Sequence, residues 1–314
     1  SPAHVKRLAR MIQMLSALDF ISRHLVVVSE NFLPALDSSR APKSSAEVMV
    51  LLVKRGGSRS ELFSTLPPGK ILDFPAGDGK ESRELAAMGF LPISSDLFAP
   101  AQKPDDFCYV QADANRTFPF RSASFDYVLS REGIEHLEYQ AQFIRECARV
   151  LKPSGRLVLT TPNVLHLYSR LSYLLSGQRT LVRGVINEIQ TPRFVGEDKV
   201  YHGHAFLIDY FRLRYLLKLA GFDQLEVFTD RFSPSSIALA PLVPIMYGAY
   251  AMSVRRSIRK DRNKRKSLSY GTVFSDIAGH VFSAAILFGK RLIVVATKGS
   301  LPTTSTNAPA MADG

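Results

Sequence analysis

Three acidic residues stand where short apolar runs of the chain end, and they form the most informative pattern in the sequence. Asp73, Asp96 and Asp113 each come at the end of such a run, which we interpret as a strand. The carboxyl ends of parallel strands meet at one edge of a sheet, where open α/β sheets bind their ligands. A carboxylate there can attract a cation or accept hydrogen bonds from a ribose or an adenine amino group. Each aspartate taken singly is also explained as a turn residue at a strand end.

A loop with two glycines follows Asp73 directly, in the segment 71–79 (ILDFPAGDG). Glycines after a strand let the backbone pass close to a ligand, and the helix that follows offers free N–H donors. The loop does not match the dinucleotide fingerprint G-x-G-x-x-G, and Gly79-Lys80-Glu81 lacks the hydroxyl residue of a Walker loop. Because an acid before the glycines repels a pyrophosphate, we expect a cationic ligand here.

The elements that must position these residues alternate along the chain from residue 70 onward. The expected strands are 70–74, 91–95, 107–111, 125–130, 155–161 and 291–297. The clearest amphipathic helix covers 138–151, and one more helix and strand fall within 206–230. Strands that alternate with helices at this spacing indicate a mostly parallel sheet covered on both faces.

Two residues after the fourth expected strand are candidates for acid–base chemistry. Glu132 and His136 are four positions apart in SREGIEHL, so on a helical turn they share a face. We expect Glu132 to orient His136 and His136 to act as a general base. The alternative is that His136 caps or packs the start of the following helix.

A second pair of histidines, His202 and His204, lies in the segment YHGH. Such a pair can ligate a metal, cover a substrate or belong to a plain loop. No third ligand stands at a convincing spacing, so we expect no metal site. We keep the pair as candidate substrate residues in a lid.

Taken together, the motifs DFPAGDG, SSD, QADANRTFPFRSASFDYVLSREGIEHL and RECARVLKPSGRLVLTTPN resemble the class I S-adenosylmethionine-dependent methyltransferases. The likeness is greatest to the branch of small-molecule and glycan O-methyltransferases that includes ubiquinone-biosynthesis enzymes, and it covers roughly 70–230 and the last strand. The resemblance implies a doubly wound, mostly parallel seven-stranded sheet and S-adenosyl-L-methionine as cofactor.

The resemblance also implies which residues bind that cofactor, and all lie at strand ends. They are Asp73, Ala76, Gly77 and Gly79 at the methionine part, Asp96 and Leu97 at the ribose, Asp113 and Ala114 at the adenine, and Ser130 and Arg131 beside the sulfonium. One departure is Pro75, which stands where the family has its first glycine. Proline stiffens the turn and removes a backbone donor.

The segment after the fourth strand helps to predict which atom of the acceptor receives the methyl group. Nucleic-acid amino-methyltransferases carry Asp/Asn-Pro-Pro-aromatic there, whereas this chain has Ser130-Arg131-Glu132-Gly133. We therefore expect O-methylation of a small, glycan or lipid-linked acceptor. Two alternatives stay open: an RNA methyltransferase that uses the basic run 255–266, and a non-catalytic S-adenosylmethionine-binding subunit that activates a partner.

Composition and charge limit the class of protein. The chain has 314 residues, 46% hydrophobic and 22% charged, which excludes a collagenous, wholly disordered or disulfide-stapled protein. Its two cysteines, Cys108 and Cys147, are expected to be buried and reduced. The first thirty residues carry charges and show no cleavage site, so we expect no secretory signal and a cytoplasmic protein.

The net charge of +12 is concentrated in the run 255–266, which holds eight Lys/Arg and one Asp. The preceding segment, residues 232–254, has no charged residue and is long enough to span a membrane. Its three prolines argue against a straight helix. We expect a protein peripheral to the inner face of a membrane, with the basic run on anionic headgroups. The alternative is a helical lid with a solvated basic loop. Nucleic acid is disfavoured because the run lacks interleaved aromatics.

The expected domain organisation has five parts. They are an N-terminal helical extension (1–65), a methyltransferase core (66–233), an apolar and basic helical insertion (234–289), the final core strand (290–298) and a disordered tail (299–314).

Overall fold

The computed structural model describes residues 63, 66–98, 108–181, 186–187, 191–194, 200–261 and 270–300. The contacts divide the chain into two compact units. The first, which we call the sheet unit, comprises 59–164, 183–228 and 291–314; the second, the helical unit, comprises 1–58, 165–182 and 229–290. The expected N-terminal extension and C-terminal tail lie outside the described residues, apart from positions 63, 299 and 300.

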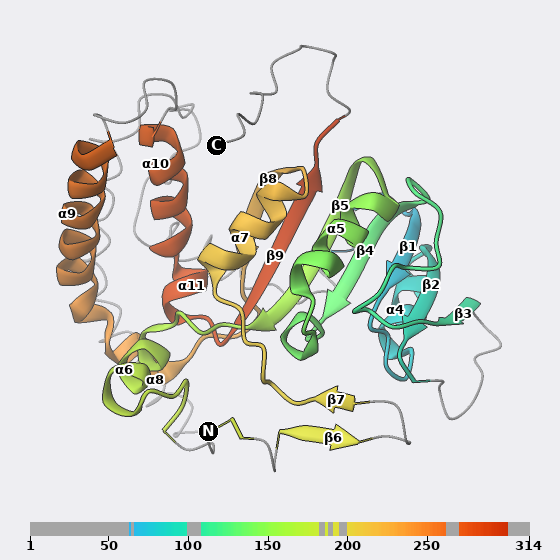
Figure 1. Ribbon diagram of the computed structural model, residues 1–314, viewed down its shortest axis with the longest axis horizontal. Helices are drawn as coiled ribbons and strands as arrows, with labels where there is room; N and C mark the ends of the chain where they lie inside the picture. The colour runs from blue at the N-terminus through green and yellow to red at the C-terminus, as the bar shows by residue number, and fades with distance from the viewer. Residues whose placement is uncertain are drawn as a thin grey trace, which may run out of the picture. The chain divides into compact units, whose positions relative to one another are not determined.

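The sheet unit is built on seven strands in the order β3-β2-β1-β4-β5-β9-β8 (Figure 1). Their bounds are β1 (Lys70–Asp73), β2 (Leu91–Asp96), β3 (Cys108–Gln111), β4 (Phe125–Arg131), β5 (Leu151–Pro162), β8 (Phe222–Phe228) and β9 (Arg291–Lys298). The first five strands pair in parallel, and β9 is antiparallel to both of its neighbours. This arrangement confirms the expected doubly wound, mostly parallel seven-stranded sheet.

The helices and short strands of this unit connect the sheet strands. They are α4 (Lys80–Ala87), the 3₁₀ turn η2 (Ile134–His136), α5 (Gln140–Val150), the pair β6 (Pro192–Phe194) and β7 (Val200–His202), and α7 (Tyr210–Leu219). Helix α5 buries the apolar stripe that its sequence predicts, including Phe143, Ile144 and Cys147. Cys108 at the start of β3 is exposed, so the expectation that both thiols are buried is wrong for that one.

Strand β5 begins earlier than the sequence predicts. Leu151 already pairs with Phe125, and the next pair in the register is Tyr127 with Arg156. The residues between them on β5, which include Pro153, form an irregularity within the strand. The proline therefore interrupts the ladder without separating helix from strand.

The helical unit consists of α6 (Leu167–Ser176), α8 (Pro234–Ala238), the 3₁₀ turn η3 (Ala240–Leu242), α9 (Val243–Asp261), α10 (Tyr270–Val281) and α11 (Ala284–Phe288). Leu167, Val243 and Leu287 form its buried cluster. His166 caps α6, and burial together with nearby cations lowers its pKa to about 4. In the part of the chain that is described, none of the helices combines the length and the apolar character needed to cross a bilayer.

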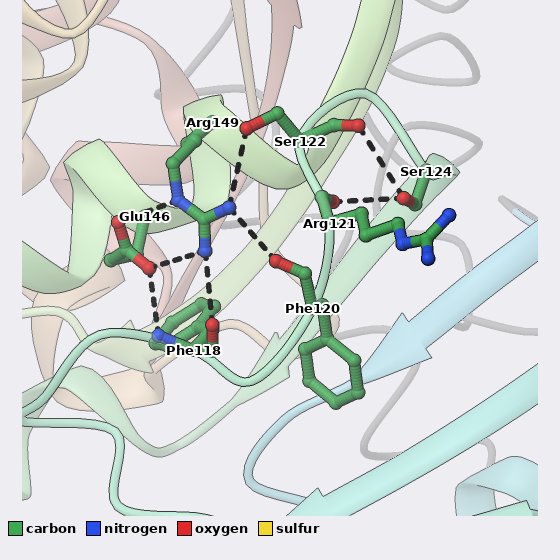
Figure 2. A network of polar contacts seen from close by, with 7 residues as sticks. All are labelled: Phe118, Phe120, Arg121, Ser122, Ser124, Glu146 and Arg149. Carbon is green, nitrogen blue, oxygen red and sulfur yellow. Dashed lines mark hydrogen bonds and ion pairs between the residues drawn. The ribbon is translucent and has the colours of Figure 1, made fainter.

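A half-buried arginine, Arg149, fixes the loop between β3 and β4 (Figure 2). The Arg149 guanidinium donates to both carboxylate oxygens of Glu146, at 2.8 and 2.7 Å, and to the carbonyls of Phe118 and Phe120. The hydrogen bond from Arg149 also lowers the pKa of Glu146. The Phe118 ring packs on Phe74, 4.9 Å between centroids, directly before the glycine loop. This network therefore stabilises the packing of Phe118 on Phe74, the residue that precedes the loop.

We predict that Arg149→Ala lowers the free energy of unfolding by about 2–3 kcal/mol, because it leaves a buried carboxylate and two carbonyls without their charged donor. Urea denaturation followed by circular dichroism measures the change. Arg121→Ala in the same loop is the matched control, because that guanidinium is exposed and contacts none of the residues drawn in Figure 2. An equal decrease in the free energy of unfolding in both variants would contradict the stabilising role of the Arg149 network.

Candidate active site

The strand order brings the three predicted aspartates to one edge of the sheet. Strands β3, β2, β1 and β4 are neighbours and run in parallel, so their carboxyl ends lie together. Asp73 and Asp96 end β1 and β2, Asp113 follows β3, and Ser130 is near the end of β4. The sequence-based placement of these four residues at a common edge is confirmed.

Asp73 is the most deeply buried of the three aspartates, with 1% of its surface exposed. Its Oδ2 accepts a hydrogen bond of 2.7 Å from the Ser82 hydroxyl in α4. Its Oδ1 is buried and has no hydrogen-bond partner among the described residues. Burial is the main reason that the pKa of Asp73 is raised to about 7. A cation placed at this carboxylate would therefore compensate a group that burial has removed from solvent.

Asp96 ties the glycine loop to the neighbouring strand. Its Oδ2 accepts from the Gly77 N–H at 2.8 Å, and its Oδ1 accepts from the Phe98 N–H at 3.2 Å. Gly77 and Gly79 have positive φ values of 57° and 74°, which explains why glycine occupies both positions. The loop is thus held in one conformation by the same carboxylate that is expected to receive a ribose.

Pro75 and Gly133 pack against each other beside the loop. A Cβ atom on Gly133 would lie 2.4 Å from Cδ of Pro75 and 3.3 Å from Oγ of Ser130. The Ser130 hydroxyl is buried and has no hydrogen-bond partner among the described residues. The bond between Phe74 and Pro75 is cis. The proline that replaces the family's glycine is therefore accommodated by a glycine from the loop after β4.

The residues expected at the adenine lie in a short turn after β3. Asp113 accepts a hydrogen bond of 2.8 Å from the Asn115 N–H and lies 3.4 Å from Arg116, while Ala114 is buried. The Leu97 carbonyl accepts from the Gln111 side chain at 2.8 Å. These contacts fix both turns next to the end of β2.

Arg131 forms an ion pair with Glu81 in the first turn of α4. Glu81 is a site residue that the sequence analysis missed, because nothing in the local spacing relates it to the end of β4. The pair joins the helix after β1 to the loop after β4. It also offsets the charge of an arginine that would otherwise repel a sulfonium.

The His136 ring is oriented by backbone carbonyls. Its Nδ1 lies 2.6 Å from the carbonyl oxygen of His202 and 3.1 Å from that of Gly203. A carbonyl only accepts hydrogen bonds, so Nδ1 is the donor in these contacts and carries a proton. Glu132 does not provide this orientation: its carboxylate lies 3.1 Å from Arg291 Nε and 3.4 Å from the Thr160 hydroxyl. The YHGH segment therefore orients the His136 ring, in place of the expected Glu132.

Three groups with metal-ligand character come together around this ring. Side-chain atoms of Glu135, His136 and His204 lie within 4.8 Å of one another, and Glu135 accepts a hydrogen bond from Thr161 in the interior. His204 is the member of the His-x-His pair that belongs to this group, and the other two members, Glu135 and His136, come from a distant part of the chain. The expectation of no metal stays a prediction.

The YHGH segment is fastened to the loop after β4 by further contacts. His202 Nε2 lies 2.7 Å from a Glu138 oxygen, and the Phe206 N–H donates to the Glu135 carbonyl at 3.0 Å. The Gln140 side chain donates to the carbonyls of Ile134 and Phe206. Both candidate lid histidines therefore lie beside His136, in one hydrogen-bonded assembly.

Comparison with known proteins agrees with this geometry. Residues 72–159, which contain the strand ends described above, match the family model described as a methyltransferase domain. The matched segment lies within the sheet unit and is similar to class I S-adenosylmethionine-dependent methyltransferases. The methyl donor of this class is S-adenosyl-L-methionine.

Three curated relatives illustrate the similarity. A probable S-adenosylmethionine-dependent methyltransferase of Mycobacterium tuberculosis is 56% identical over 45 residues, which is 14% of this chain and 16% of the relative. The ubiquinone biosynthesis O-methyltransferase of Caulobacter vibrioides is 31% identical over 102 residues, 30% of this chain and 40% of the relative. The demethylmenaquinone methyltransferase of a Mycobacterium species is 35% identical over 96 residues, 30% of this chain and 41% of the relative. The chain thus spans less than half the length of each of these proteins.

The methyltransferase domain offers groups that suit this cofactor. Asp73 Oδ1 and Ser130 Oγ are buried polar atoms with no hydrogen-bond partner among the described residues, and they belong to adjacent strands. The cofactor carries a sulfonium and an ammonium, which are the charge and the donor that such atoms require. The donor set at the strand ends therefore fits S-adenosyl-L-methionine.

We predict that cofactor affinity rises as the pH increases from 5.5 to 7 and then levels off. Binding of a cation favours ionised Asp73, whose pKa of about 7 means that a proton must be released at lower pH, which costs up to about tenfold in affinity per pH unit. The raised pKa also means that the free energy of unfolding falls as the pH rises from about 4 to 7. Calorimetric titration with S-adenosyl-L-methionine measures the affinity; Asp73→Asn should bind more weakly and without this slope. The same dependence of affinity on pH in the wild-type protein and in Asp73→Asn would contradict the assignment of Asp73 as the group that receives the cation.

We predict that Gly133→Ala weakens cofactor binding at least about tenfold while leaving the domain folded, because the added methyl must displace Pro75 and with it the glycine loop. Titration with S-adenosyl-L-methionine and a thermal melt check the two parts. Gly248→Ala in α9 is the control, since no atom lies within 4 Å of its added methyl. Unchanged binding in Gly133→Ala would show that the contact with Pro75 does not govern the loop.

Proposed function

We propose that the protein transfers a methyl group from S-adenosyl-L-methionine to an oxygen atom of a small, glycan or lipid-linked acceptor, with His136 as the general base. The observation that carries this proposal is the pair of carbonyls that hold Nδ1 of His136. With Nδ1 as the donor to these carbonyls, Nε2 is the nitrogen of the neutral ring to which we assign the acceptor's proton. The names of two relatives, a ubiquinone biosynthesis O-methyltransferase and a demethylmenaquinone methyltransferase, favour acceptors of small-molecule type.

On the cofactor side, we assign binding roles to the residues of four strand ends. Asp73 would receive the cationic methionine part, Asp96 the ribose and Asp113 the adenine. Ala76, Gly77 and Gly79 would let the cofactor approach the backbone, Leu97 and Ala114 would contact the nucleoside, and Ser130 would lie beside the sulfonium. Arg131 would hold Glu81 and thereby the start of α4, so its ion pair stabilises the pocket wall.

The bound cofactor supplies a methyl group on a good leaving group. The chain then has two tasks, which are to orient the acceptor and to remove its proton. Orientation in near-attack geometry can lower the barrier by on the order of 7–11 kcal/mol. His136 Nε2 would take the hydroxyl proton, a contribution of typically 10²–10⁴-fold. His202 and His204 would contact the acceptor from the YHGH segment, where they are fixed beside His136.

The helical unit supports an acceptor at or near a membrane surface. Ile245 and Met252 are exposed on α9, and Arg255, Arg256 and Arg259 are exposed near its end. Apolar side chains followed by arginines are typical of segments that bind anionic lipid surfaces. Residues 262–266 of the basic run lie outside the described residues. Because the protein would then be peripheral to the membrane, quinone precursors and lipid-carried glycans are the favoured acceptors.

We predict that His136→Ala lowers kcat by about 10²–10⁴-fold without changing the dissociation constant of S-adenosyl-L-methionine, because it removes the base and no cofactor contact. Transfer of a labelled methyl group to a membrane lipid extract measures the rate, and calorimetry measures cofactor binding.

His280→Ala in α10 of the helical unit controls for the loss of an imidazole and should keep the wild-type rate. Normal turnover in His136→Ala would exclude the base. Absence of transfer by the wild-type protein to any fraction of the extract, together with normal cofactor binding, would favour the non-catalytic alternative.

A further inference from the structure

Helix α7 has an apolar face that the sheet unit does not cover. Tyr210, Leu213 and Leu217 are buried against the rest of the unit, as its amphipathic pattern predicts. Phe211, Tyr215 and Leu219 recur every four residues on the other side, with 42%, 62% and 67% of their surface exposed. We call these three residues the outer stripe. A row of large exposed apolar side chains on one helix marks an interaction surface.

A groove of about 500 Å³ lies beside the outer stripe, between α7 and the start of α5. Tyr139, Tyr215 and Leu216 provide apolar walls, and Arg145 and Arg212 also line it. Tyr139 is itself 60% exposed. The groove and the stripe thus form one surface in which aromatic and aliphatic side chains alternate with arginines.

The charge of this surface is positive. Helix α7 exposes Arg212 and Lys218 and has no acidic residue within its bounds, and Arg145 of α5 is exposed nearby. The acidic residue of the groove is Glu138, whose carboxylate lies 2.7 Å from His202 Nε2. An anionic partner would therefore be attracted by several basic side chains and repelled by few acidic ones.

We propose that the outer stripe and the groove dock on an anionic lipid surface. Phenylalanine, tyrosine and leucine side chains flanked by basic residues are the composition of helices that lie in the membrane interface. A second copy of this chain is disfavoured, because a two-fold interface would set these arginines against their equivalents. Single-stranded RNA, whose bases could stack on the rings of Phe211 and Tyr215, is the alternative that the test below separates from lipid.

This surface lies close to the proposed base along the chain. Glu138 and Tyr139 of the groove follow His136 by two and three residues, in the segment that the YHGH loop fastens. Docking here would bring the entrance of the site to the lipid surface and favour acceptors that are anchored in the membrane. The docking itself does not depend on methyl transfer, whereas this consequence rests on the proposed function.

The test is flotation of the full chain with vesicles of phosphatidylcholine alone and of phosphatidylcholine with phosphatidylglycerol, at low and high salt. We expect binding to the anionic vesicles that weakens with salt. The combined variant Phe211→Ser, Tyr215→Ser, Leu219→Ser should bind about tenfold more weakly. Leu91→Ser is the matched control, because Leu91 is 68% exposed on β2, away from α7. Near-ultraviolet circular dichroism and the melting temperature verify that all variants are folded.

Each outcome decides the proposal. Wild-type affinity of the folded triple variant for anionic vesicles would overturn it, as would the absence of vesicle binding by the wild-type protein. Loss of a dimer in light scattering or loss of RNA binding in the same variant, with vesicle binding unchanged, would assign the surface to those partners. Failure of docking is distinguishable from failure of the proposed function: His136→Ala should still bind vesicles, and the triple variant should still methylate a detergent-dispersed acceptor.

Discussion

The structure of the site depends on a carboxylate that folding has removed from water. Asp73 ends the central strand β1, and one of its oxygens is held by Ser82 while the other has no described partner. Such a group is unfavourable in the free protein, which is why its pKa approaches neutrality. The fold tolerates this cost at the place where we propose that the cofactor brings positive charge. The surrounding loop is held by other residues, Asp96 above all, so it does not depend on the ligand for its shape.

The assembly around His136 shows how a distant insertion can complete a site. The carbonyls of His202 and Gly203 come from the segment between β7 and α7, and they determine which ring nitrogen carries the proton. Backbone carbonyls do not ionise, so this orientation persists over the whole pH range in which the protein is folded.

The parts of this structure that were predictable are those governed by local pattern. Each of the first four sheet strands was located to within one residue at either end, because short apolar runs alternate there with amphipathic helices. The aspartates at the strand ends followed from the topology. What local pattern could not show are contacts between distant segments. Glu132 and His136 are four positions apart, but the residues between them do not form an α-helix, because η2 is a 3₁₀ turn that begins at Ile134. Glu132 also adopts a positive φ of 46°, so its side chain does not share a helical face with His136. Glu81 and Glu135 were unassigned for the same reason, since their partners are remote.

The close packing of Pro75 on Gly133 has a consequence for the natural variation of this fold. The ring of one residue occupies the volume that a side chain on the other would need. In proteins built on the same site, a proline at the first position should therefore occur together with glycine at the second, and chains with a larger residue at the second should retain glycine at the first. The two positions are expected to change together during evolution, although 58 residues separate them along the chain.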